Sequence, residues 1–247
     1  MHCAAPSSGS GLKAMRKVAI IAALEREIGA LIAPAKRIEG EYQGRKFTFF
    51  ERGETVMVCG GIGVEAARRA AEAVIALYRP EILQSVGFAG ALQSDLRVGD
   101  LFMPSVVLDA RDGSRTSVGS GTGILLTFMS VAGAAQKSTL AQAYGAQAID
   151  MEAAAVAAAA RAHGIAFGAT KVISDGLNFE MPDMSRFIDI QGRFKTPAFA
   201  AYVAVRPWLW GRAGELACNS SQAAKALAAH LSQSSDLASG MIEAKTM

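Results

Sequence analysis

Residues 17–23 read KVAIIAA, a continuous apolar run of the length of a β-strand. Such a run is typical of a parallel sheet with helices on both faces, because both sides of each strand are then buried. Further apolar runs of strand length recur along the chain, and Ala-rich or amphipathic stretches of helical length separate them. This alternation predicts an α/β protein with a mostly parallel central sheet flanked by helices.

Apolar runs, glycines and prolines set the bounds of the predicted elements. We expect strands at residues 17–23, 46–51, 55–59, 82–86, 100–108, 124–130 and 165–173. We expect helices at residues 25–32, 65–78, 136–144, 152–163, 198–205 and 220–231. Pro34 and Pro80 follow the first two helices, and Gly145 and Gly164 follow the next two, as is usual at helix ends.

The composition predicts one folded domain over residues 16–232. Hydrophobic residues make up 51% of the 247 residues and charged residues 19%, which supplies enough apolar material for a sizeable core. Residues 1–15 and 233–247 are predicted to be a flexible N-terminal extension and a flexible C-terminal tail. The formal net charge is +3, from 25 basic and 22 acidic residues, with no basic run. Nucleic-acid binding is therefore not expected.

The chain shows no sign of membrane insertion, export or metal binding. The longest stretch without charge, residues 116–136, has a strongly apolar part that is too short to span a bilayer. Residues 1–15 lack the apolar region of a signal peptide. Cys3, Cys59 and Cys218 lie far apart, without metal-ligand spacing. We expect a cytoplasmic protein without a metal or a transmembrane segment.

Two glycine-containing segments follow predicted strands. The segment GGIG at residues 60–63 lacks the third glycine of a dinucleotide-binding fingerprint, and it is equally consistent with a tight turn between strand and helix. The segment Gly87, Phe88, Ala89 and Gly90 follows the run at 82–86. Small residues at the carboxyl end of a strand let a ligand approach the backbone, so this segment is a candidate binding site.

Three acidic residues follow three different strand-like runs. Asp175 comes just after residues 167–173, Glu152 starts a predicted helix, and Glu27 follows the first strand. Taken alone, Glu152 could be a partner of the helix dipole and Glu27 a solvated helix residue. Together they could meet at one edge of the sheet, where their mutual proximity would raise the pKa of at least one of them. The histidines lie in predicted tails or at a helix end, so histidine catalysis is not expected.

The ordered segments AALEREI, GGIGVEAA, SVGFAGAL, VGD, AIDMEAAAVA and KVISD, between residues 17 and 175, resemble the nucleoside phosphorylase and nucleosidase superfamily. The resemblance is strongest to the methylthioadenosine/S-adenosylhomocysteine nucleosidases. The C-terminal third and residues 135–153 also resemble the hopanoid-associated phosphorylase branch, which acts on an adenosyl-lipid. The resemblance implies a single-domain, three-layer phosphorylase-type fold with a mostly parallel mixed sheet, assembled as a homo-oligomer built from dimers or trimers.

The resemblance also implies a role for each motif residue. Asp175, with Ser174 beside it, would donate a proton towards N7 of a purine. Glu152 would hold the ribose hydroxyls, Met151 would lie against the sugar, and Glu27 would orient the attacking water. Gly87, Phe88, Ala89 and Gly90 would contact the ribose and the nucleophile. Ser130 and Val131 would contact the base.

The implied activity is cleavage of the N-glycosidic bond of an adenosine-type nucleoside, by water or by phosphate as co-substrate, with no cofactor. This agrees with the residue types, since a protonated base leaves more readily and anionic groups stabilise a cationic sugar. The alternatives are a phosphorylase acting on an adenosyl-lipid and a catalytically weak nucleoside-binding protein.

Departures from the family pattern bear on these alternatives. Arg26 lies between two acidic residues, and Ser85 and Phe88 stand where the phosphorylases carry an arginine and a serine. These differences favour water over phosphate. Residues 100–136 form a shorter segment than in typical nucleosidases, so methylthio specificity does not follow. The apolar residues Val203, Trp208, Leu209 and Trp210 could line an acceptor site, but core or oligomer contacts are the preferred interpretation.

Overall fold

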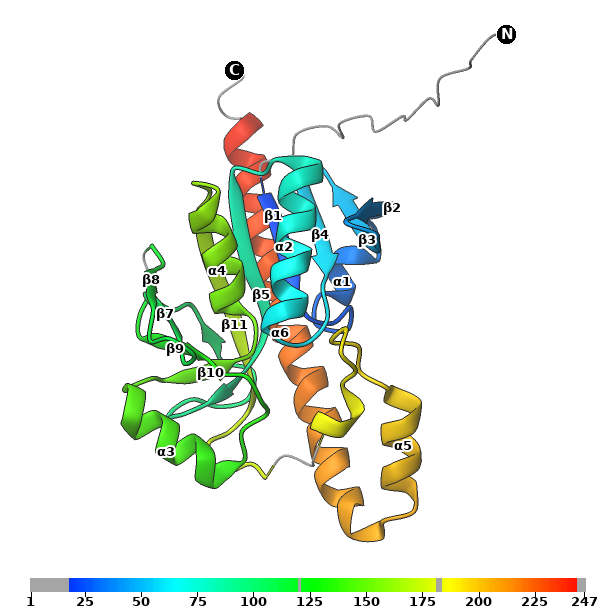
Figure 1. Cartoon of the computed structure of the whole chain (residues 1–247), viewed down its shortest axis with the longest axis vertical. Coiled ribbons are helices and arrows are strands. Elements are labelled where there is room, and N and C mark those ends of the chain that lie inside the picture. The colour runs from blue at the N-terminus through cyan, green and yellow to red at the C-terminus, as the bar shows by residue number, and fades with distance from the viewer. Residues whose placement is uncertain (1–17, 120, 181–183, 244–247) are drawn as a thin grey trace, which may run out of the picture.

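The computed structural model describes residues 18–119, 121–180 and 184–243. The chain folds into one large mixed sheet with helices on both faces (Figure 1). This confirms the three-layer α/β architecture. The predicted N-terminal extension, residues 1–15, lies outside the described residues.

Strand β1 (Val18–Ala22) is at the centre of the parallel part of the sheet, between β4 (Thr55–Cys59) and β5 (Ile82–Ala91). Strand β11 (Ala166–Asp175) pairs in parallel with the other edge of β5. On one side the sheet continues antiparallel through β3 (Arg45–Arg52) to β2 (Lys36–Tyr42). Because all four central strands run the same way, their carboxyl ends meet at one edge.

A second group of strands joins the sheet through the far end of β5. Strand β10 (Ala148–Asp150) pairs antiparallel with β5 and in parallel with β9 (Ile124–Thr127). Strand β7 (Val106–Asp109) follows β9 in parallel, and β8 (Arg115–Ser117) closes this side. The short β6 (Leu101–Phe102) pairs with β11. The sheet is therefore mixed, as the resemblance implies.

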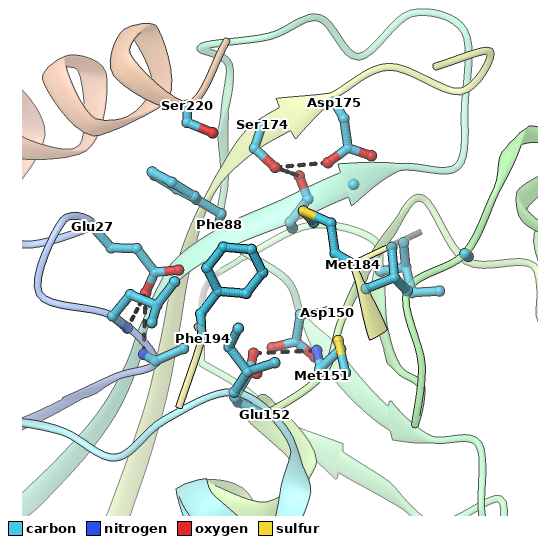
Figure 2. A pocket seen from close by; sticks show the side chains of 18 of the residues that line it. Glu27, Phe88, Asp150, Met151, Glu152, Ser174, Asp175, Met184, Phe194 and Ser220 are labelled. Carbon is cyan, nitrogen blue, oxygen red and sulfur yellow. Dashed lines mark hydrogen bonds between the residues drawn. The ribbon is translucent and has the colours of Figure 1, made fainter. Parts of the chain in front are cut away.

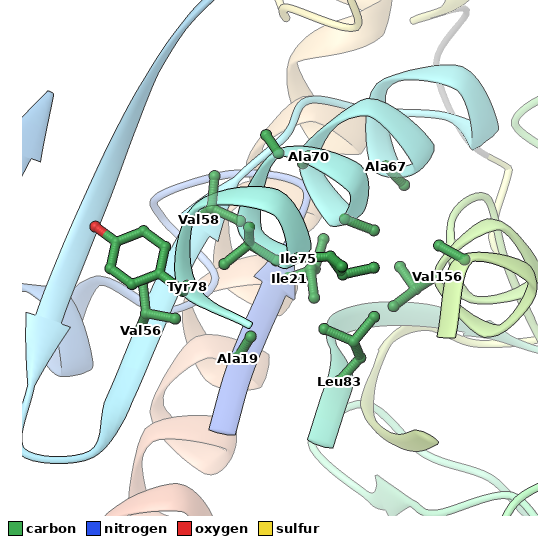
Figure 3. Packing of buried hydrophobic residues seen from close by; sticks show 14 of the residues in the cluster. Ala19, Ile21, Val56, Val58, Ala67, Ala70, Ile75, Tyr78, Leu83 and Val156 are labelled. Carbon is green, nitrogen blue, oxygen red and sulfur yellow. The ribbon is translucent and has the colours of Figure 1, made fainter. Parts of the chain in front are cut away.

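Helices α2 (Val64–Tyr78) and α4 (Ala153–Ala162) cover one face of the sheet. Small alanines of α2 and α4, with Val156, let α2 pack closely on β1 and β4, and α4 on β5 and β11 (Figure 3). Helices α1 (Gly29–Ile32) and α6 (Trp210–Glu243) cover the opposite face, where Leu31 and Leu227 contact the other side of the same strands. Burial on both faces is the reason why residues 18–23 are apolar throughout.

Several predicted elements have different bounds in the structure. The predicted helix at 25–32 shrinks to α1, because the Glu27 side chain folds back onto the chain before it. Pro104 divides the predicted strand at 100–108 into β6 and β7, since proline has no N–H for strand pairing. Strand β5 runs on through the segment Gly87–Gly90, so this segment lies in a strand and is not a turn after it.

The last helix differs most from its predicted bounds. It runs from Trp210 to Glu243, well beyond the predicted 220–231. Residues 233–243, assigned by sequence to a flexible tail, continue this helix, and residues 244–247 lie outside the described residues. Helices α3 (Ala134–Tyr144) and α5 (Thr196–Ala204) and the α3 cap at Gly145 agree with prediction. Strands β2, β8 and β10 are not predicted, because they are polar or only three residues long.

Candidate active site

Glu27 lies just beyond the carboxyl end of β1 and is buried, with an exposure of 6%. Its Oε2 accepts hydrogen bonds from the N–H groups of Ala23 (3.1 Å) and Leu24 (3.2 Å), which fixes the carboxylate at the edge of the sheet. Burial raises the pKa of Glu27 above its usual value, and the nearby Lys171 only partly offsets this. A carboxylate with a raised pKa is a stronger base than a solvated one.

The backbone of β5 leaves room for Glu27 because residue 87 is a glycine. A Cβ atom at Gly87 would stand 2.7 Å from Glu27 Oε2, and Gly87 has a φ of +151°. Only glycine fits both the close approach and the backbone conformation. Gly87 therefore positions Glu27, although it does not itself line the cleft described below.

Asp150, at the end of β10, organises the start of α4. Its carboxylate accepts hydrogen bonds from Thr127 Oγ1 (2.6 Å) and from the N–H of Ala153 (2.9 Å), and it forms a buried ion pair with Lys171 Nζ (2.9 Å). These contacts cap the helix and fix the residue that precedes it. Asp150 is not among the predicted site residues, although its position in the segment IDMEA was a usable signal.

Glu152 occupies the N-cap position of α4 and points into the same cavity as Glu27 (Figure 2). Its Oε1 accepts a hydrogen bond from the N–H of Gly63 (2.7 Å). The GGIG segment thus forms the turn between β4 and α2 and also holds Glu152. Burial, and then the charge of Asp150, raise the pKa of Glu152 to about 8. The pKa values of Glu27 and Glu152 are both raised, but chiefly by burial, and of the predicted carboxylates only Glu27 adds a small part to the rise at Glu152.

Asp175 ends β11 and is buried, with an exposure of 4%. Its Oδ1 accepts a hydrogen bond from Ser174 Oγ (2.7 Å). Its Oδ2 accepts one from Lys137 Nζ, which also donates to the carbonyl oxygen of Gly176 (2.7 Å). A Cβ at Gly90 would stand 2.8 Å from Asp175 Oδ2, so this glycine makes room for the carboxylate as Gly87 does for Glu27.

Lys137, on α3, is not among the predicted site residues. Its side chain is only 2% exposed. A helix-face pattern could have revealed it, because Lys137 precedes the buried Leu140 and the partly buried Tyr144 by three and seven residues on the inward face of α3. A lysine at such a position is buried only if its charge finds a partner.

These side chains surround one cleft at the carboxyl edge of the sheet, with about 870 Å³ of space, part of it open to solvent (Figure 2). This volume suits a small-molecule ligand. The predicted residues that line it, coming from five separated segments, are Glu27, Phe88, Ala89, Gly90, Ser130, Val131, Met151, Glu152, Ser174 and Asp175. Gly87 is the one predicted site residue that does not line the cleft. The three carboxylates therefore meet, as the sequence predicts.

The C-terminal part of the chain supplies an apolar side of the cleft through Met184, Ile188, Phe194 and Leu216. None of these residues is predicted as a site residue. Val203, Trp208, Leu209 and Trp210 do not line the cleft, which corrects the suggestion that they form an acceptor site. They do not belong to the core either, since Trp208 is 72% and Trp210 56% exposed.

In the described part of the chain, no group of three or more histidine, cysteine, aspartate or glutamate side chains could hold a metal ion. In the same residues, no helix combines the length and apolar character needed to cross a membrane.

An α/β sheet with a cleft at its carboxyl edge, lined by three carboxylates, has the arrangement of a small-molecule binding site. The chain belongs to the phosphorylase superfamily, whose family model matches residues 17–134 and 124–196. No curated protein shows significant similarity to the sequence.

Solved structures share the fold at low sequence identity. The methylthioadenosine nucleosidase of Arabidopsis thaliana superposes with a TM-score of 0.69 at 18% identity, over 91% of this chain and 96% of that one. The methylthioadenosine/S-adenosylhomocysteine nucleosidase of Helicobacter pylori gives 0.63 at 17% identity, over 89% and 99%. A futalosine hydrolase mutant of Helicobacter pylori gives 0.59 at 18% identity, over 66% and 89%. At these identities the likeness shows the fold alone.

Proposed function

We propose that the protein hydrolyses the N-glycosidic bond of an adenosine-type purine nucleoside and releases the base. The observation that carries this proposal is the meeting of Glu27, Glu152 and Asp175 in one cleft. Breaking a ribosyl–purine bond produces a cationic sugar and an anionic base. Carboxylates beside the sugar stabilise the cation, and a proton donor beside the base helps it leave.

Each carboxylate has a place in this reaction. Asp175, with Ser174, faces the base and mediates its protonation. Glu152 holds the ribose hydroxyls, with Met151 against the sugar and the backbone of Phe88, Ala89 and Gly90 beside the ribose. Ser130 and Val131 contact the base. Glu27 takes a proton from water as the water attacks the sugar.

Water is favoured over phosphate by the charges of the cleft. Glu27 is fixed at the edge of the sheet, where its carboxylate can take a proton from water but would repel a dianion. Lys137 and Lys171 are already held by Asp175 and Asp150. Arg26 lines the cleft, but it lies beside the ring of Phe194, with 6.0 Å between its guanidinium carbon and the ring centroid.

The test is the release of adenine from a panel of 5′-substituted adenosines, with and without phosphate. Hydrolysis predicts free ribose sugars as products and equal rates in both conditions. Release that requires phosphate and yields a sugar 1-phosphate would contradict hydrolysis but keep glycosidic cleavage. Tight nucleoside binding by calorimetry without any base release would favour a binding protein.

A second candidate substrate is an adenosyl-lipid. The apolar side chains of Met184, Ile188, Phe194 and Leu216 along the cleft favour an apolar 5′ substituent. The panel should therefore include 5′-alkyl and 5′-alkylthio adenosines of increasing length. A catalytic efficiency, kcat/KM, that rises with chain length would support this candidate, and one that falls would contradict it.

We also propose that the protein is a cytoplasmic homo-oligomer. Helix α5 has no buried residue in the single chain, and Val205, Trp208 and Trp210 are exposed beside it. Exposed apolar side chains that lie together commonly mark contacts between protein copies. Light scattering of the purified protein measures the assembly, and a monomeric mass at micromolar concentration would contradict it.

A further inference from the structure

Lys137 is a buried cation in direct contact with the carboxylate that faces the base. It comes from α3, and its side chain passes beside β5, where its Cε lies 3.3 Å from the position of a Cβ at Gly90. Only two groups accept hydrogen bonds from its Nζ among the described residues, Asp175 Oδ2 and the carbonyl oxygen of Gly176. Burying an ammonium group is costly unless it is paired. The burial of Lys137 in the cleft therefore suggests a role in the chemistry of the site.

Both oxygens of Asp175 lie beside hydrogen-bond donors. Asp175 Oδ1 faces the hydroxyl of Ser174 and Oδ2 faces the ammonium of Lys137, so both oxygens accept. A carboxyl group whose two oxygens both face donors is in its acceptor-only, ionised form. In this ion pair the proton nearest to Asp175 Oδ2 is one that Lys137 carries.

We propose that Lys137 is a positioning residue that fixes Asp175 and supplies the proton which Asp175 passes to the departing base. This inference rests on the proposed function and deepens it. Lys137 Nζ gives a proton to Asp175 Oδ2, and Asp175 gives that proton to the purine ring as the electron pair of the glycosidic bond moves onto the base. Lys137 is left as a neutral amine and Asp175 again as a carboxylate.

The rest of the reaction balances this transfer. Water adds to the sugar carbon, and Glu27 takes the proton that the water loses. Release of that proton from Glu27 to solvent, and uptake of one by Lys137, restore the starting state. The net reaction is the addition of one water across the glycosidic bond, with no co-reactant.

The experiment compares two leaving groups in Lys137→Met and Lys137→Arg variants. One substrate is the 5′-substituted adenosine that the wild-type protein cleaves fastest, whose base must be protonated to leave. The other is 4-nitrophenyl riboside, whose phenolate leaves without a proton. A loss confined to the first substrate points to proton supply, because a distorted site would lower the rates of both. Lys36→Met, at an exposed position on β2, is the matched control.

We expect Lys137→Met to lower kcat for the adenosine by roughly 10²- to 10⁴-fold, with KM changed much less. Its kcat for the nitrophenyl riboside should stay within about tenfold of wild type. Lys137→Arg keeps the ion pair and should keep the melting temperature, but an arginine does not give up its proton. It should therefore still lose at least about tenfold on the adenosine and keep the nitrophenyl activity.

Two results overturn the inference. One is a smaller loss than tenfold on the adenosine in either variant, and the other is an equal loss on both substrates. If Lys137→Met does not fold, Lys137→Arg decides by the same thresholds. If the wild-type protein releases no base from any nucleoside, the proposed function is wrong and the inference falls with it. Wild-type release that is insensitive to Lys137 overturns the inference alone.

Discussion

Replacing Gly90 by alanine should displace Asp175 without removing any chemical group. The added Cβ would stand 2.8 Å from Asp175 Oδ2 and 3.2 Å from Ile149 Cγ2, whereas ordinary contact begins at 3.4 Å. The carboxylate must therefore move by about 0.6 Å, against the hydrogen bonds from Ser174 and Lys137. A misplacement of about 1 Å at a catalytic group costs on the order of 10²-fold in rate. We expect kcat to fall by about 10- to 100-fold.

Crowding in a packed interior also lowers stability, by typically 1–3 kcal/mol. For a chain of this size each kcal/mol lowers Tm by about 2–4 °C, so a decrease of roughly 2–12 °C is expected. Adenine release measures kcat, and thermal unfolding followed by circular dichroism measures Tm. Gly214→Ala is the control, because a Cβ there meets nothing within 4 Å. A Gly90→Ala variant with a kcat within threefold of wild type and an unchanged Tm would refute the idea that this glycine positions Asp175.

Three further predictions follow from the same site. Asp175→Asn should lower kcat by about 10²- to 10⁴-fold, and turnover within about tenfold of wild type in the adenine-release assay would contradict its role. Gly87→Ala should lower kcat by displacing Glu27, whose Oε2 would lie 2.7 Å from the new Cβ, and an unchanged rate would show that Glu27 moves freely. The pKa of Glu152 is raised from 4.5 to about 8 on folding. Between these two pH values the folded state holds a proton on Glu152 that the unfolded state has already lost. The free energy of unfolding of wild type should therefore fall relative to Glu152→Gln as pH rises through that window, by up to about 1.4 kcal/mol per unit, and parallel curves from denaturant titrations would exclude this.

The sequence predicts those parts of the fold that depend on local patterns. Strands that are buried on both faces, such as β1, can be recognised from their apolar runs. Alanine-rich helices that end near Pro80 or Gly145 can be recognised too. Strands β2 and β10 are not, because β2 is a polar strand at the edge and β10 has only three residues. Their existence depends on neighbours that are distant in sequence.

The carboxylates of the site were predictable because each follows its own strand-like run. The apolar side of the cleft was not, since Met184 and Ile188 come from one segment and Leu216 from another, without a shared motif. Lys137 shows the remaining difficulty. A lysine on a helix is usually solvated, and only the arrival of Asp175 from a distant strand gives it a buried partner.

Strand β5 carries both glycines that accommodate carboxylates of the cleft, Gly87 beside Glu27 and Gly90 beside Asp175. Three residues of strand span about 10 Å, and this length is set by backbone geometry. In the proposed reaction, a rigid strand would thus fix the separation between the water side and the base side, whereas residues of the C-terminal segments would contact the 5′ end of the nucleoside. Under the proposed function, changes in those segments would alter the range of substrates without altering which bond is cut.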